Sequence, residues 1–132
     1  MRGAVAARRA TMPEQPAEGK ISMAITVNLY YTGENGAARK FVEEMEASGT
    51  ADAIRAEDGN VRYRYFQPLD DPETILLIDA WESQEALDVH HASPMMTKIA
   101  ELRDKYDLHM TAERYRTDEA GLPAHDQAFI RQ

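Results

Sequence analysis

The chain has 132 residues, of which 43% are hydrophobic and 29% are charged, and its formal net charge is −8 at pH 7. This length and composition indicate one soluble globular domain. The negative charge argues against nucleic acid and anionic membranes as partners, and no apolar run reaches the ~20 residues of a membrane span. The chain has no cysteine, which excludes disulfides, zinc–thiolate sites and cysteine nucleophiles and fits a cytoplasmic location. Its four histidines show no strong metal-binding spacing, so we expect no metal, and the absence of a GxGxxG motif is consistent with a site that needs no cofactor.

The first 22 residues differ in character from the rest of the chain. They contain two prolines, four basic and two acidic residues, and they show no periodic apolar pattern. The stretch also lacks the apolar core of a secretory signal. We therefore expect residues 1–22 to be a flexible extension, or a stretch upstream of a start at Met23.

The folded part is expected to begin with a strand over residues 23–31, because apolar and polar side chains alternate there. One face would carry Ile25, Val27, Leu29 and Tyr31, and the other Thr26, Asn28 and Tyr30. A turn at residues 32–36, with Asn35 as the helix cap, leads to an expected helix over residues 37–47. A shorter helical piece over about residues 51–57 would end at Gly59.

Two more strands are expected next. Residues 61–66 alternate, with Tyr63 and Tyr65 on the side opposite Arg62 and Arg64. Residues 74–81 are apolar toward both sides, which predicts that both faces of this strand are covered. Its one acidic residue, Asp79, needs a partner or a polar pocket.

The C-terminal third is predicted to be two helical segments, one strand and a tail. Ser83 would cap a helix that reaches His90, and Ser93 would cap a second helix that runs to about residue 105. The last strand is expected over residues 107–116. The folded domain would thus span residues 23–117, and residues 118–132 would form a loose arm or a strap that binds a partner.

The element order β-α-β-β-α-β predicts a ferredoxin-like α+β fold with a four-stranded antiparallel sheet. Helices cover only one face of such a sheet. The other face of this sheet is too rich in aromatic and aliphatic residues to stay in water. We therefore expect a homodimer in which two sheets face each other and close a barrel.

A resemblance to a known family is centred on the segment from Trp81 to Pro94, which reads Trp-Glu-Ser, then Ala-Leu, then His90, then Ser-Pro. Two upstream segments, Glu57-Asp58-Gly59-Asn60-Val61-Arg62-Tyr63 and Asp70-Asp71-Pro72, belong to the same pattern. Over about residues 23–117 the chain resembles the antibiotic biosynthesis monooxygenase domain, and more narrowly the bacterial proteins classed as quinol monooxygenases.

The resemblance implies a dimeric α/β barrel, in agreement with the element order. It also implies an oxidoreductase, namely a cofactor-independent monooxygenase that oxidises a planar quinol or polyphenol with O₂. The same superfamily contains haem-degrading enzymes, isomerases and members without known activity. A dimer that binds a small ligand without turnover, an isomerase and a haem-degrading enzyme therefore remain alternatives.

Three residues are expected to be catalytic by this resemblance. His90 would be a general base or hydrogen-bond donor toward a phenolic substrate, or else make a capping or interhelix hydrogen bond. Asn28 is similar in placement to a first-strand Asn of relatives that bind oxygen or a substrate oxygen, or it would satisfy a dimer contact. Trp81 would give a planar ligand a flat apolar wall, or would fill the core.

Five further residues are expected to bind substrate: Tyr30, Asp79, Arg64, Tyr65 and Met95. Asp79 would bond a substrate hydroxyl, or pair with Arg62 or Arg64 across the sheet. The tyrosines and Met95 would line the pocket, unless they are core residues. Trp81, Asn28, Asp79 and His90 are expected to border one small, mainly apolar chamber left where the two sheets of a dimer press together.

Overall fold

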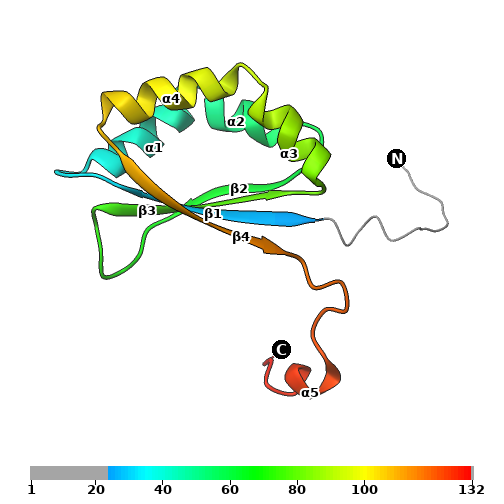
Figure 1. The fold of residues 1–132 in the computed structure, drawn as a ribbon. Helices are drawn as coiled ribbons and strands as arrows, with labels where there is room; N and C mark the ends of the chain where they lie inside the picture. Colours follow the sequence, from blue (N-terminus) through cyan, green and yellow to red (C-terminus); the bar gives the residue numbers. More distant parts are fainter. Residues whose placement is uncertain (1–23, 132) are drawn as a thin grey trace.

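A computed structural model describes residues 24–131 (Figure 1). The expected extension at residues 1–22 lies outside the described residues, as do Met23 and Gln132. No helix within the described range is long and apolar enough to cross a membrane. The elements are β1 Ile25–Thr32, α1 Ala37–Ala47, α2 Thr50–Arg55, β2 Asn60–Phe66, β3 Thr74–Trp81, α3 Gln84–His91, α4 Met95–Lys105, β4 His109–Arg116 and α5 Ala124–Gln127.

The four strands form one antiparallel sheet in the order β2-β3-β1-β4. The central pair runs in register from Ile25 opposite Trp81 to Thr32 opposite Thr74. Each of the two helical connections is split, into α1 and α2 before β2 and into α3 and α4 before β4. The predicted ferredoxin-like α+β fold is confirmed.

The register sorts the strand side chains onto two faces, because successive residues of a strand point to opposite sides. The helix-facing side carries Ile25, Val27, Leu29, Tyr31, Tyr63, Tyr65, Ile75, Leu77, Asp79, Trp81, Met110, Ala112, Arg114 and Arg116. The opposite, open face carries Thr26, Asn28, Tyr30, Arg62, Arg64, Phe66, Leu76, Ile78, Ala80, Thr111, Glu113 and Tyr115.

The four helices α1 to α4 cover only the first of these faces (Figure 1). The core lies between them and the sheet, where Phe41 and Met45 of α1, Ile54 of α2 and Leu77 and Trp81 of β3 are at most 1% exposed. As predicted, β3 is apolar toward both faces, but within the described residues only its helix side is covered.

Two of the three predicted helix caps are wrong. The residue before α1 is Gly36 and not Asn35, and the Glu73 carboxylate accepts the backbone N–H groups of both, at 2.9 and 3.2 Å. The residue before α4 is Pro94, and the buried Oγ of Ser93 has no hydrogen-bond partner among residues 24–131. Ser83 caps α3 as predicted, because its Oγ accepts the N–H of Ala86 at 3.1 Å.

The turn between α2 and β2 depends on Gly59. This residue has φ +84°, and a Cβ built on it would lie 2.5 Å from the Cβ of Ala86 in α3. Only glycine fits both the left-handed backbone and the close approach. The left-handed backbone expected at Gly59 is confirmed, but α2 ends earlier than predicted, at Arg55, and the contact with Ala86 brings this turn against α3.

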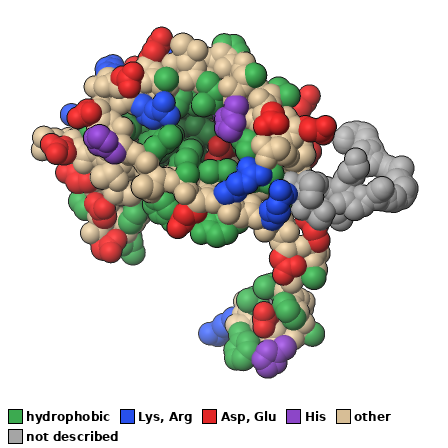
Figure 2. Space-filling model, in the orientation of Figure 1, with side chains coloured by type: hydrophobic (Ala, Val, Ile, Leu, Met, Phe, Trp, Pro, Cys, Tyr) green, Lys and Arg blue, Asp and Glu red, His purple; other side chains and the backbone are tan. Residues whose placement is uncertain are grey.

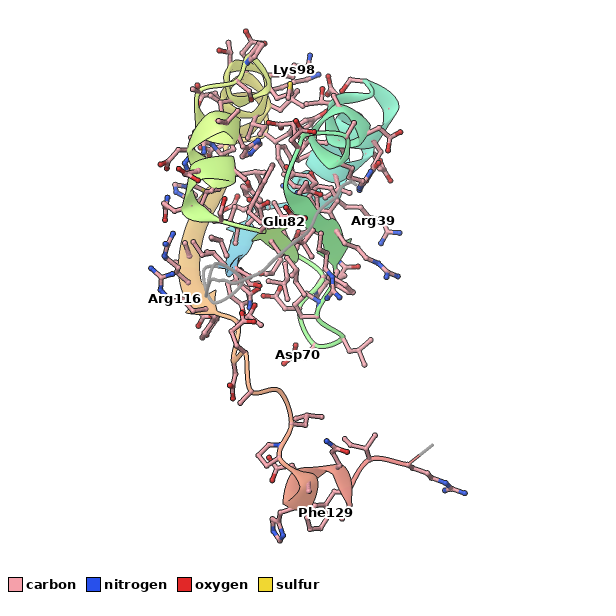
Figure 3. The ribbon with its side chains drawn as sticks, turned by 90° about the vertical axis from the view of Figure 1, so that its right-hand side faces the viewer. Arg39, Asp70, Glu82, Lys98, Arg116 and Phe129 are labelled. Carbon is pink, nitrogen blue, oxygen red and sulfur yellow. The ribbon has the colours of Figure 1, made fainter. Side chains whose placement is uncertain are left out.

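Residues 118–131 form an arm that leaves the end of β4 and turns to the side of the sheet away from the helices (Figures 1 and 3). All of these residues are exposed, including Leu122, Phe129 and Ile130. Among the described residues, the hydrogen bonds of this segment stay within it, for example from Gln127 Nε2 to the carbonyl of Leu122 at 2.9 Å. Its predicted role as a partner-binding strap stays a prediction.

Candidate active site

A buried carboxylate and the indole of the single tryptophan are paired at the end of β3. Trp81 Nε1 donates to Asp79 Oδ1 at 2.6 Å. Trp81 is 0% exposed and Asp79 is 5% exposed. Both lie on the helix-facing side, because they are two residues apart on one strand. The second oxygen, Oδ2, has no hydrogen-bond partner among the described residues.

His90 of α3 lies directly over this pair. Its ring stacks on the indole of Trp81, with 4.7 Å between ring centroids and 25° between the planes. Its Nδ1 lies 2.8 Å from Oε2 of Glu57, at the end of the α2 segment. An ionised carboxylate can only accept, so Nδ1 carries the proton and the lone pair of a neutral His90 is on Nε2.

Burial raises the pKa of Asp79 from 3.8 to about 6. The hydrogen bond from Trp81 and the charge of His90 act in the opposite direction and limit the rise, and the nearby Glu57 adds to it. Asp79 therefore changes protonation near neutral pH. Buried carboxyl groups with this property are frequent at functional sites.

The paired groups adjoin a hollow between the helices and the sheet. Figure 2 shows this hollow lined with hydrophobic side chains, with an acidic side chain in its floor and basic side chains at its rim. Asp79 is the one acidic residue on the helix-facing side of β1 to β4. Val27 and Leu29 of β1, with Met95 and Met96 of α4, pack on the core but are only partly buried, as expected for walls of a hollow.

The hollow opens toward the edge strand β4, whose eight residues are all exposed. Two contacts cross this opening. The guanidinium of Arg114 on β4 donates to Oε1 of Gln84 on α3. Nη1 of Arg103 on α4 approaches Sδ of Met110 on β4, at 3.9 Å. These two arginines border the mouth.

The structure brings only part of the predicted site together. His90, Trp81, Asp79, Tyr65 and Met95 lie between the sheet and the helices. The hydroxyl of Tyr65 donates to that of the neighbouring Tyr63 at 3.4 Å, and burial raises the pKa of both phenols.

The other three predicted residues, Asn28, Tyr30 and Arg64, point to the open face. The expectation that Trp81, Asn28, Asp79 and His90 border one chamber between two sheets is wrong, because the sheet itself separates Asn28 from the other three. The buried Oδ1 of Asn28 has no hydrogen-bond partner among residues 24–131. The expected pairing of Asp79 with Arg62 or Arg64 is also wrong, because both arginines lie on the opposite face.

Sequence reasoning missed Glu57 and Arg114. Glu57 lies in a segment that carries the family resemblance, but no local pattern connects it with His90, 33 residues later. The helix-facing position of Arg114 could have been found from the alternation of β4, had the register of that strand with β1 been known.

A second, shallow groove runs along the outer edge of β2 and is lined by Arg55, Asn60, Val61, Arg62, Tyr63 and Arg64. Its innermost cation, Arg55, is already bound to Glu46, Asp52 and the carbonyl of Tyr63. No cluster of three or more His, Asp or Glu side chains with metal-binding geometry occurs in residues 24–131. We therefore place the candidate site in the hollow.

Comparison with known proteins agrees with the fold. Residues 24–102 match the family model of the antibiotic biosynthesis monooxygenases. No curated protein matches the chain.

Solved structures with the same fold come from several organisms. A conserved protein from Methanosarcina mazei Go1 is 21% identical, with a TM-score of 0.65 over 75% of this chain and 97% of that one. SnoaB from Streptomyces nogalater, a cofactor-independent oxygenase, is 21% identical, with a TM-score of 0.61 over 76% and 97%. A protein from Mycobacterium tuberculosis is 22% identical, with a TM-score of 0.56 over 74% and 99%.

Proposed function

Because the chain belongs to the antibiotic biosynthesis monooxygenase family, we propose that it is a cofactor-independent monooxygenase that oxidises a planar quinol or polyphenol with O₂. The observation that carries this proposal is the buried arrangement of Glu57, His90, Trp81 and Asp79 beside an apolar hollow. The name of SnoaB, a cofactor-independent oxygenase with the same fold, supports it.

The geometry fits a substrate that supplies its own electrons. His90, held by Glu57 with its Nε2 lone pair available, takes the proton of a substrate hydroxyl. Asp79 accepts a hydrogen bond from a second hydroxyl through Oδ2. The stack of Trp81 and His90 and the aliphatic walls of the hollow exclude water from the quinolate.

The reaction balances without a further reductant. The quinolate gives one electron to O₂, and the two radicals combine at a ring carbon that carries hydrogen. Loss of water from this adduct leaves a hydroxyquinone. One oxygen atom of O₂ stays in the product and the other leaves as water, so the quinol supplies all four electrons.

Oxygen uptake tests this proposal. Purified protein in the presence of a chelator is mixed with a panel of benzo- and naphthoquinols in an oxygen electrode, and uptake above the uncatalysed rate is measured. We expect saturable uptake with a planar quinol. In His90→Gln we expect kcat to fall at least tenfold, because general acid–base catalysis typically contributes about 10²–10⁴-fold. Quinol binding in a thermal-shift assay with no uptake would support the alternative of a non-catalytic binding protein.

We also propose that the protein is a homodimer formed through the open sheet face. Leu76, Ile78 and Phe66 lie on that face, and the helices leave it uncovered. The amide of Asn28 lies in the middle of it with a buried oxygen that has no described partner, which a second copy would supply. The active hollow is on the other side of each sheet, so each subunit would hold its own site.

A further inference from the structure

The geometry points to a ring-bearing acid as the ligand of the hollow: a hydroxylated bicyclic aromatic whose carboxylate binds Arg114 while its hydroxyl reaches Asp79. This inference rests on the proposed function for the location of the site, and it adds the chemical class of the ligand. It does not require turnover.

The first support is the sheet register. Arg114 of β4 lies opposite Val27 of β1, and Val27 lies opposite Asp79 of β3. All three side chains point to the helix side. Two strand spacings separate Arg114 from Asp79, which is about 10 Å between their backbones. Val27, partly buried between them, forms an apolar floor on which a flat ring system fits.

The second support is that the guanidinium of Arg114 has no carboxylate partner among the described residues. Its partner is the neutral amide of Gln84, which places the group across the mouth of the hollow. Gln84 donates in turn to Asp88 at 2.8 Å, so an amide separates the cation from that carboxylate. No carboxylate lies within salt-bridge distance of Arg114 or Arg103 among residues 24–131.

Within the described part of the chain, Arg103 and Arg114 lack carboxylate partners although the whole chain is acidic. The chain has 23 acidic against 15 basic residues, and two of its surface arginines, Arg39 and Arg55, are paired with carboxylates. The two arginines at the mouth are not, and Asp79 in the floor is not held in its ionised form by either of them. A planar guanidinium binds a carboxylate through two parallel hydrogen bonds, which a neutral ligand cannot replace.

A matched pair of probes tests the inference. The chain has a single Trp, so Trp81 fluorescence reports binding next to Asp79. Titrations without oxygen, to prevent turnover, compare 1,4-dihydroxy-2-naphthoate with 1,4-dihydroxynaphthalene, which lacks only the carboxylate. We expect the acid to bind roughly tenfold tighter or more, the equivalent of one charge-assisted hydrogen-bonded pair.

Three variants decide between outcomes. Arg114→Gln should remove the preference for the acid, and Arg114→Lys should keep part of it because the charge remains. Arg62→Gln, which removes an exposed cation from the open face, should leave the preference unchanged. Equal affinity of wild-type protein for both probes, or a preference that survives Arg114→Gln, would overturn the inference.

The inference and the proposed function can fail separately. A preference for the acid that depends on Arg114, without oxygen uptake, would support the ligand class and refute the monooxygenase. Oxygen uptake with both probes at equal KM would support the monooxygenase and refute the proposed ligand class.

Discussion

Trp81 and His90 stack with their ring centroids 4.7 Å apart. Each ring forms a hydrogen bond with a different carboxylate, Trp81 with Asp79 and His90 with Glu57. Two acids that would repel each other are thus kept apart by two flat rings inside one site. Burial holds the pKa of Asp79 near 6, so this acid is poised to accept or donate a hydrogen bond at neutral pH.

The raised pKa of Asp79 predicts a specific dependence of stability on pH. Between pH 3.8 and about 6 the folded protein binds more protons than the unfolded chain, so this group lowers the free energy of unfolding as pH rises through that range. Asp79→Asn should abolish this contribution. Relative to wild type, the free energy of unfolding of the variant should rise by about 1 kcal/mol between pH 5 and pH 7.5, because one pKa unit corresponds to about 1.4 kcal/mol.

Urea denaturation at both pH values measures this change. Asp70→Asn, which alters an exposed loop carboxylate, is the control and should follow wild type (Figure 3). An Asp79→Asn variant with the same pH profile as wild type would contradict the assigned pKa.

Glu57 is expected to position His90. Glu57→Ala leaves Nδ1 of a 2%-exposed His90 without a partner, and we expect a loss of about 1–3 kcal/mol in stability. Glu57→Gln keeps a hydrogen-bonding oxygen but removes the charge, so it should fold normally and shift the pH profile of oxygen uptake. Glu85→Gln, on the exposed side of α3, should change neither. An unchanged pH profile in Glu57→Gln would limit Glu57 to a structural role.

The open sheet face predicts the oligomeric state. Wild-type protein should sediment as a dimer at micromolar concentration, and Ile78→Glu should give a folded monomer because it places a charge in the centre of the interface. Leu69→Glu, in the exposed loop before β3, should remain dimeric. A monomeric wild-type protein would refute the proposed interface.

Gly59 should be far less tolerant of substitution than Gly36. Both have positive φ, but only at Gly59 would a new Cβ collide with a neighbour, Ala86. Gly36→Ala should cost about 1–2 kcal/mol from the left-handed backbone alone. Gly59→Ala should cost clearly more, because α3 must also move away. Equal losses of unfolding free energy for the two variants in chemical denaturation would show that α3 does not press on this turn.

Most of the fold was predictable because most of its elements have a clear period of apolar residues. The alternation in β1 and β2 and the helical spacing in α1 and α4 gave the order βαββαβ and hence the sheet. The caps at Asn35 and Ser93 were predicted wrongly because a distant side chain, Glu73, replaces the first, and Pro94 takes the place of the second.

The site was less predictable, and β3 shows why. This strand is apolar toward both faces, so its sequence does not reveal which face Trp81 shares with β1. The register, with Trp81 opposite Ile25, places it on the helix side and separates it from Asn28. The contact of His90 with Glu57 joins two helical segments far apart in sequence, and only the folded structure reveals such a contact.

The most direct test of the proposed chemistry uses ¹⁸O₂. Purified, chelator-treated protein is allowed to oxidise 1,4-dihydroxy-2-naphthoate or 1,4-dihydroxynaphthalene under ¹⁸O₂, and the product is examined by mass spectrometry. We predict one ¹⁸O atom per hydroxyquinone, formed at least tenfold faster by wild-type protein than by His90→Gln. A product without ¹⁸O, or labelled product formed equally by both proteins, would contradict monooxygenation in the hollow beside Trp81.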